Sequence, residues 1–202
     1  FLSPHHASLA ELPQGARLGT ASLRRAAQAL HKRPDLQIIP LRGNVDTRLA
    51  KMEAGEADAI LLAASGLNRL GLSHLPRGLL DPHECPPAAA QGALAIQTRA
   101  EDADAPWLAP LKHGPTTLAV AAERGVLEVL EGSCRTAIGA YAQVNGAHLV
   151  LVAEALTPNG DRRFRQEGEI DLSGDDPRVQ ARDLGRRLGQ AIAAEAGGAL
   201  AL

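Results

Sequence analysis

Two adjacent arginines stand where a helix is predicted to begin. In LGTASLRRAAQ, residues 18–28, Arg24 and Arg25 lie at the start of a helix predicted to begin at Ser22. The first turn of a helix carries unpaired N–H groups and a partial positive charge, so each cation there costs up to about 1 kcal/mol when no anion is bound. A carboxylate or phosphate held by an arginine fork at that end reverses the sign. The pair is therefore either part of an anion site or two side chains that extend into water.

Arginine recurs at the two following strand-to-helix junctions. Arg42 ends a second candidate strand, and Arg48 lies one turn into the helix that follows. Arg69 lies in a short helix after the third candidate strand. Because ligands of open α/β sheets bind at the carboxyl ends of the strands, the three junctions predict one cleft for a ligand with several negative groups. Small or polar residues at the same junctions are expected to line it: Thr20, Ser22, Gly43, Asn44, Ala63 and Gly66.

The two cysteines differ in their surroundings. Cys134 lies in the loop of EGSCRTAIG, next to Arg135, and a neighbouring cation lowers the pKa of a thiol. Its thiolate is a nucleophile that could bind a ligand covalently, and the alternative is an unreactive buried thiol. Cys85, between Glu84 and Pro86, is interpreted as unreactive. The seven histidines form no metal-ligand spacing with the cysteines, so no metal site is predicted.

Composition and charge narrow the class of ligand. The 202 residues are 45% hydrophobic and only 2% aromatic, with a net charge of −2, which predicts a soluble, folded chain without the stacking surface of a nucleic-acid binder. Between Arg17 and Lys51, however, eight basic residues stand against two acidic ones, which fits a discrete anionic ligand. With two distant cysteines, no apolar run of roughly 20 residues and no signal-peptide pattern, we expect a cytoplasmic protein that contacts no membrane.

Helix and strand patterns alternate in the first part of the chain. Strands are predicted at 16–20, 36–41 and 57–64, and helices at 22–32, 44–55 and 67–70. The last strand, ADAILLAA, is apolar throughout, as expected for a strand covered on both faces. This βαβαβα order predicts an α/β fold, with a mostly parallel sheet and helices on both sides.

A different pattern follows the closely spaced prolines Pro82, Pro86 and Pro87, which mark a connection. Asn145-Gly146 is a strong hairpin signal between two candidate strands. This part of the chain is therefore expected to be a smaller α+β domain with a three-stranded antiparallel sheet and helices. The sequence predicts a strand at 93–99, a helix at 116–130 closed by Gly132, strands at 138–144, 148–156 and 164–170, and a helix from 177 to about 195, opened by Asp176.

Four stretches, in unbroken order, resemble motifs of the porphobilinogen deaminase (hydroxymethylbilane synthase) family. They are LGTASLRRAAQ, RPDLQIIPLRGNVDTRLAKMEAGEADAILLAASGLNRLGL, AAAQGALAIQTR and AAERGVLEVLEGSCRTAIGAYA. The resemblance implies a monomeric transferase of tetrapyrrole biosynthesis, which joins four units of its substrate porphobilinogen with loss of ammonia and releases hydroxymethylbilane. For the first half of the chain it implies a sheet domain like those of periplasmic binding proteins.

The resemblance also implies a role for each candidate residue. The cysteine of the family's EG-x-C loop, here Cys134, carries a dipyrromethane cofactor through a thioether. Arginines at the matched positions hold the acetate and propionate groups of the cofactor and of the growing chain, and here they are Arg24, Arg25, Arg42, Arg48 and Arg69. Other matched positions line the cleft, and here they are Thr20, Ser22, Asn44 and Gln91.

The resemblance covers two of the family's three domains. Residues 1–88 resemble the domain that binds the cofactor and anionic groups, and residues 113–202 the domain to which the cofactor is attached. Residues 89–112 resemble a connection and a segment that completes the first domain. The rest of that first domain, with the catalytic aspartate, has no counterpart, since Asp46 and Asp58 belong to other motifs. Arginine cannot act as a base, so we expect no catalytic residue in this chain and little or no activity from it alone.

Two positions depart from the family pattern, and two other functions stay open. Ala90 stands where glycine is usual, and Ala137 where proline is usual. The chain could instead be a non-catalytic anion-binding module of the periplasmic-binding-protein type, in which case the Cys134 thiol would be free. A nucleic-acid binder using the basic region would show steeply salt-dependent binding.

Overall fold

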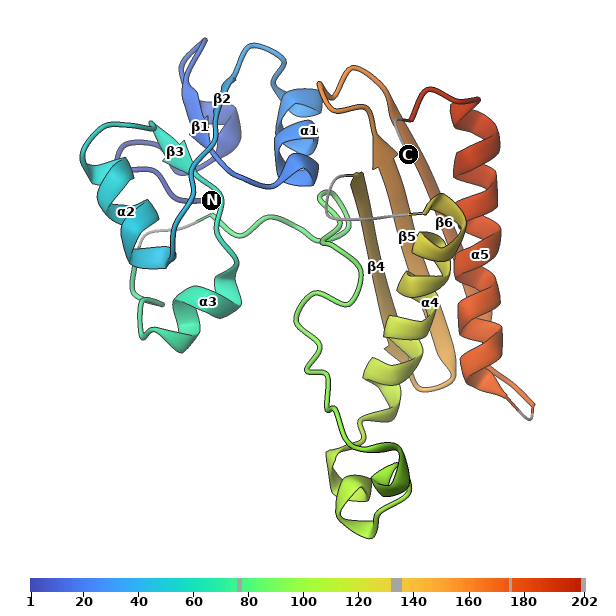
Figure 1. The fold of residues 1–202 in the computed structure, drawn as a ribbon. Coiled ribbons are helices and arrows are strands. Elements are labelled where there is room, and N and C mark those ends of the chain that lie inside the picture. The colour runs from blue at the N-terminus through green and yellow to red at the C-terminus, as the bar shows by residue number, and fades with distance from the viewer. Residues whose placement is uncertain (76–77, 132–135, 175, 201–202) are drawn as a thin grey trace.

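The computed structural model describes residues 1–75, 78–131, 136–174 and 176–200 (Figure 1). A parallel sheet forms the centre of the N-terminal unit, residues 1–75, and an antiparallel sheet that of the C-terminal unit, residues 114–200. Between them run a connecting segment, residues 78–91, and an arm, residues 93–113, that extends away from both sheets. The expected combination of an α/β part with an α+β part is therefore confirmed.

The parallel sheet has the strand order β2-β1-β3. Its last strand is much shorter than predicted, because the chain turns into the next helix at the N-cap Ala63. On this strand Ile60 also exchanges two backbone hydrogen bonds, of 3.0 and 2.8 Å, with Leu2, which adds an antiparallel contact at the edge. The elements are β1 (Arg17–Gly19), α1 (Leu23–Lys32), β2 (Gln37–Ile39), α2 (Val45–Glu53), β3 (Ala59–Ile60) and α3 (Ala64–Arg69).

Helices cover both faces of the parallel sheet, as predicted. Successive side chains of a strand point to opposite faces, and the two residues of β3 show this directly. Ala59 belongs to a buried cluster with Ala29 of α1, whereas Ile60 belongs to a second cluster with Met52 of α2. The side chain of Asn44 accepts a hydrogen bond from the first turn of α2, so the predicted N-cap is confirmed, and Ser22 caps α1 in the same way.

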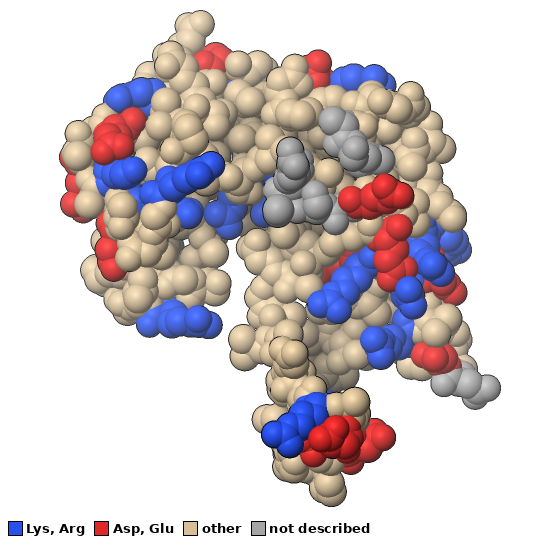
Figure 2. Space-filling view, in the orientation of Figure 1, with Lys and Arg blue, Asp and Glu red and all other residues tan. Residues whose placement is uncertain are grey.

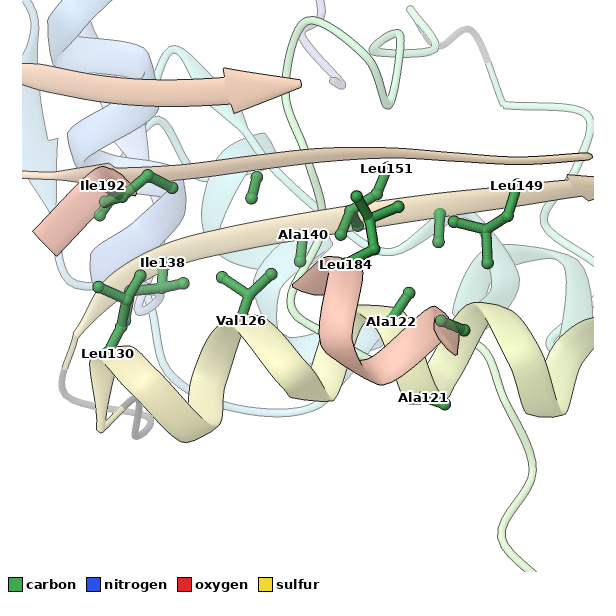
Figure 3. Close-up of a cluster of buried hydrophobic side chains, with 14 of the residues drawn as sticks. Ala121, Ala122, Val126, Leu130, Ile138, Ala140, Leu149, Leu151, Leu184 and Ile192 are labelled. Atoms are coloured by element: carbon green, nitrogen blue, oxygen red, sulfur yellow. The ribbon is translucent and has the colours of Figure 1, made fainter. Parts of the chain in front are cut away.

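The C-terminal unit is an antiparallel sheet with two helices on one face (Figure 3). Asn145 pairs with His148 across the predicted hairpin turn. Glu131, in a left-handed conformation, caps the end of α4, and Gly132, the predicted closing residue, lies outside the described residues. The strands lie in the order β4-β5-β6, and the elements are α4 (Gly114–Leu130), β4 (Ala137–Asn145), β5 (His148–Leu156), β6 (Arg163–Asp171) and α5 (Pro177–Ala196).

The strand predicted at 93–99 is wrong. No strand is formed there, and Leu94 is 84% exposed. A strand needs a partner edge for its backbone groups, and none of the described strands lies beside this segment. The arm continues through two short 3-10 helices, Ala100–Asp102 and Pro106–Leu111. None of the described helices is long and apolar enough to span a membrane.

The connecting segment packs between the two units. Its prolines form a loop, as predicted, and Pro86 is buried. The backbone N–H of Ala140, on the edge strand β4, donates to Pro87 O at 2.9 Å. A Cβ on Gly139 would lie 2.6 Å from Pro86 O, so glycine permits this close approach. The division at 1–88, 89–112 and 113–202 stays a prediction.

Candidate functional site

A cavity of about 560 Å³ lies between α1, the chain after β3 and the connecting segment. Its apolar wall includes Leu61, Leu67 and Leu79. Volumes of roughly 300–1,000 Å³ with a few convergent polar groups are typical of small-molecule sites. Four residues predicted from the sequence line this cavity, namely Arg24, Arg25, Ala63 and Gln91.

Arg24 is buried rather than extended into water. The residue is only 8% exposed. Its Nη1 donates hydrogen bonds to Gln28 Oε1 at 2.9 Å and to Pro86 O at 2.8 Å. Burial, together with the like charge of Arg25, lowers the pKa of Arg24 to about 10, so the guanidinium remains charged at neutral pH. For Arg24, the alternative of a solvated side chain is wrong.

Arg25 brings the three strand-to-helix junctions together. It is half-buried, and its Nη1 donates to Leu61 O, at the end of β3, at 3.2 Å. Burial is the main cause that lowers the pKa of Arg25, and repulsion by Arg48 of α2 is the second. Arg48 is itself oriented by a hydrogen bond from Nε to Gly43 O at 2.8 Å. The positive charges of Arg25, from the first junction, and Arg48, from the second, therefore lie near each other. The carbonyl oxygen of Leu61, at the third junction, accepts the hydrogen bond from Arg25.

The other predicted residues lie outside the cavity wall. Arg42 and Arg69 are exposed, and Thr20 is buried, with its hydroxyl accepting a hydrogen bond from Ser22 N at 3.2 Å. Ser22, Asn44 and Gly43 shape the starts of α1 and α2. In the space-filling view, lysine and arginine side chains lie on both units, and a hollow separates the N-terminal unit from the arm (Figure 2). The roles assigned to these residues stay predictions.

Cys134 lies outside the described residues, but the strand that follows its loop is placed. Ala137, at the start of β4, is buried in a cluster with Leu23 and Ala27 of α1. Ala137, three positions after Cys134 in the sequence, therefore packs within one helical turn of Arg24.

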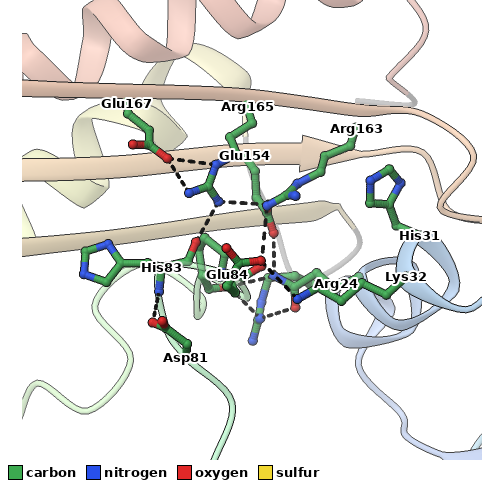
Figure 4. A network of polar contacts seen from close by, with 12 residues as sticks. Arg24, His31, Lys32, Asp81, His83, Glu84, Glu154, Arg163, Arg165 and Glu167 are labelled. Atoms are coloured by element: carbon green, nitrogen blue, oxygen red, sulfur yellow. Dashed lines mark hydrogen bonds and ion pairs between the residues drawn. The ribbon is translucent and has the colours of Figure 1, made fainter. Parts of the chain in front are cut away.

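A buried polar network that the sequence patterns did not predict lies behind Arg24 (Figure 4). Glu154 of β5 is fully buried, and it accepts hydrogen bonds from Gln28 of α1 and from Arg163 of β6. A signal was present, since an acidic residue in the apolar strand HLVLVAEAL must be paired inside the protein. Gln28 lies one helical turn after Arg24, and nothing in the local sequence indicates that its side chain belongs to this network.

A second buried carboxylate ties the connecting segment to the C-terminal unit. Glu123 of α4 accepts hydrogen bonds from Ala90 N at 2.6 Å and from Ala142 N at 3.0 Å. Burial raises the pKa of Glu123, and these two hydrogen bonds act in the opposite direction. Because β4 is an edge strand, the carboxylate satisfies a backbone donor that has no neighbouring strand.

Fold and cavity together define an α/β protein with a cationic, apolar-walled cavity of small-molecule size. Residues 1–106 match the family model described as "Porphobilinogen deaminase, dipyromethane cofactor binding domain", and residues 117–194 match "Porphobilinogen deaminase, C-terminal domain". The chain belongs to the porphobilinogen deaminase family, an enzyme family of tetrapyrrole biosynthesis.

Several bacterial proteins named porphobilinogen deaminase are similar over the whole chain or nearly so. That of Caulobacter vibrioides (strain NA1000 / CB15N) is 63% identical over 202 residues, covering 100% of this chain and 63% of the relative. That of Phenylobacterium zucineum is 61% identical, covering 100% of this chain and 63% of the relative. That of Ralstonia nicotianae is 46% identical over 192 residues, with 94% and 57% covered. The chain thus spans less than two thirds of the length of these relatives.

Proposed function

We propose that this chain supplies the part of a porphobilinogen deaminase that binds the carboxylates of a dipyrromethane cofactor and of the growing pyrrole chain. The observation that carries the proposal is the cavity in which Arg24 and Arg25 face an apolar wall. Pyrrole rings suit that wall, and their acetate and propionate groups suit guanidinium forks. Arg48, Arg42 and Arg69 would extend the positive field toward further rings.

Attachment of the cofactor through Cys134 is the second part of the proposal. Ala137 packs on α1, whose Arg24 lines the cavity, and Cys134 precedes Ala137 by only three positions, a stretch of chain that spans at most roughly 11 Å. A dipyrromethane bound there supplies the free pyrrole carbon to which porphobilinogen is added. The chain's own part is to orient the carboxylates and to exclude water from one face of the rings.

We further propose that the 202-residue chain alone consumes little or no porphobilinogen. Loss of ammonia and the proton transfers need an acid or base, and the described residues that line the cavity include no carboxylate. Arginine stays protonated and cannot take this role. Steady porphobilinogen consumption by the pure chain would contradict this part of the proposal.

A titration with a free dipyrromethane that carries four carboxylates tests the carboxylate site. We expect binding that weakens at least about tenfold in Arg24→Ala and in Arg25→Ala, because each loses a charge-assisted fork. Arg178→Ala is the matched control, since Arg178 is exposed at the start of α5. Equal binding by all three variants would overturn the proposal.

Intact mass distinguishes the enzyme from a non-catalytic anion-binding module of the periplasmic-binding-protein type. A chain heavier by one dipyrromethane, with the added mass lost in Cys134→Ala and kept in Cys85→Ala, supports the enzyme. A Cys134 thiol fully open to alkylation favours the module. The same proposal includes the division into residues 1–88, 89–112 and 113–202, the likeness of the N-terminal unit to periplasmic binding proteins, a monomeric state and a cytoplasmic location.

A further inference from the structure

We infer that Gln28 and Glu154 are positioning residues that hold the Arg24 guanidinium at the wall of the cavity. The inference rests on the proposed function, in which Arg24 binds a carboxylate. Neither residue needs to touch the ligand, because both act through Arg24.

Gln28 uses both ends of its amide in this contact. Its Oε1 accepts from Arg24 Nη1 at 2.9 Å, while Nε2 donates to Pro86 O at 2.9 Å and to Glu154 Oε1 at 2.6 Å. A flipped amide would place two donors against each other at Arg24 and two acceptors against each other at Glu154. The amide orientation is therefore fixed, and with it the acceptor that Arg24 meets.

Glu154 fixes Gln28 from the other unit. Its second oxygen, Oε2, accepts from Arg163 Nε at 2.7 Å, and Arg165 Nη1 lies 3.8 Å away. A fully buried carboxylate is costly unless it is paired and hydrogen-bonded, and here both oxygens are satisfied. The same arginines donate to carbonyl groups of the connecting segment, Arg163 to Glu84 O and Arg165 to His83 O.

Arg24 is thereby held at one nitrogen and left open at the others. To the residues that the structure describes, it donates only through Nη1, and both acceptors of Nη1 belong to this network or its neighbour Pro86. The remaining N–H groups can meet a ligand in the cavity that Arg24 and Gln28 both line. A guanidinium fixed before binding loses less side-chain entropy when the ligand arrives.

A double-mutant cycle with the dipyrromethane tetracarboxylate as probe tests this inference on the intact chain. We expect Gln28→Ala to weaken binding about 5- to 10-fold, which lies within the range for the net worth of one hydrogen bond. In the Arg24→Ala background the same change should have no further effect, because there is no guanidinium left to position. A residue with a merely structural role would weaken binding equally in both backgrounds.

Two further variants keep the outcomes distinct. Gln14→Ala, at an exposed position, is the matched control and should bind as the unchanged chain does. Glu154→Gln should also weaken probe binding when Arg24 is present and have no further effect in the Arg24→Ala background. Thermal unfolding measures separately how much this variant changes the stability of the fold. If Gln28→Ala binds normally, or if its effect adds to that of Arg24→Ala, the inference is overturned while the proposed function stands. If the unchanged chain binds no probe, both fail.

Discussion

Ala90 is held in a backbone conformation that favours glycine. Its φ of 62° lies in the left-handed region, which costs a residue with a Cβ about 1–2 kcal/mol. The hydrogen bond of 2.6 Å from Ala90 N to Glu123 requires the turn at this point. The conformation of Ala90 therefore predicts an energetic cost that glycine at this position would not carry.

We predict that Ala90→Gly raises the free energy of unfolding by up to about 1 kcal/mol. Relief of the left-handed strain exceeds the roughly 0.5–1 kcal/mol that glycine loses through its greater freedom in the unfolded chain. Denaturant unfolding of the intact chain measures the difference. Ala88→Gly is the control, since Ala88 has no left-handed φ and should only lose stability. A loss in both variants would show that Ala90 is not strained.

The ion pair between Arg17 and Asp58 predicts a pH-dependent contribution to stability. Asp58 Oδ2 accepts from Arg17 N at 2.8 Å and Oδ1 from Nη2 at 2.8 Å, and hydrogen bonds from the Arg17 side chain and backbone lower the pKa of Asp58. A carboxyl whose pKa falls on folding stabilises the fold above its unfolded pKa of about 3.9 and loses that contribution as pH falls through the folded value.

Asp58→Asn should therefore lower the free energy of unfolding at pH 7, by under about 1 kcal/mol because the pair is more than one third exposed. The difference from the unchanged chain should shrink as the pH falls below about 4, where Asp58 itself becomes neutral. Urea unfolding at several pH values measures this. A difference that is constant between pH 7 and pH 3 would contradict the assigned cause.

At the scale of elements, the two helices of the C-terminal unit approach each other at glycines. A Cβ on Gly185 of α5 would lie 1.9 Å from Ala122 O of α4, and a Cβ on Gly125 would lie 2.2 Å from Arg182 O. Alanine normally stabilises a helix by about 1 kcal/mol relative to glycine. Here backbone atoms occupy the space, so the helices must separate before a methyl group fits.

We predict that Gly185→Ala lowers the free energy of unfolding by about 1–3 kcal/mol, because the steric cost exceeds the gain in helix propensity. Thermal and denaturant unfolding measure the change. Gly114→Ala is the matched control, since nothing lies within 4 Å of a Cβ built at that helix start. That variant should be neutral or slightly more stable, and an equal loss in both would argue against close helix packing as the cause.

Local patterns were sufficient to predict most elements of this fold. The helix periodicity and caps of α1 and α2 involve residues close in sequence, as does the Asn145-Gly146 turn, so the sequence shows them directly. The strand at 93–99 was wrong because a strand depends on a partner edge, which no local pattern contains. The approach of Arg25 to Arg48 and to Leu61 could be predicted from sheet topology, whereas the contact between Gln28 and Glu154, 126 positions apart, could not.

At the scale of the whole molecule, the two units are joined by contacts independent of the arm. Pro87 O accepts from Ala140 N of β4, and Gly160 of the β5–β6 turn lies against α1, where its carbonyl oxygen is 2.9 Å from His31 Nδ1. The Gln28–Glu154 hydrogen bond is buried in the same interface. The arm, by contrast, exposes large apolar side chains, including Leu94, Ile96, Trp107 and Leu111. We therefore expect the two units to stay together when the chain is cut within the arm, because these contacts hold them.

Limited digestion with trypsin tests that expectation. Arg99 lies exposed in the arm, outside any helix or strand, and we predict cleavage there before cleavage within either unit. The two fragments should elute together in size-exclusion chromatography, because residues 78–91 stay attached to the N-terminal fragment and remain bound to β4 and α4 through Pro87 and Ala90. Arg99→Gln, which removes the cleavage site, serves as the control. Fragments that separate without denaturant would show that the arm holds the units together and that the polar network between α1 and β5 does not.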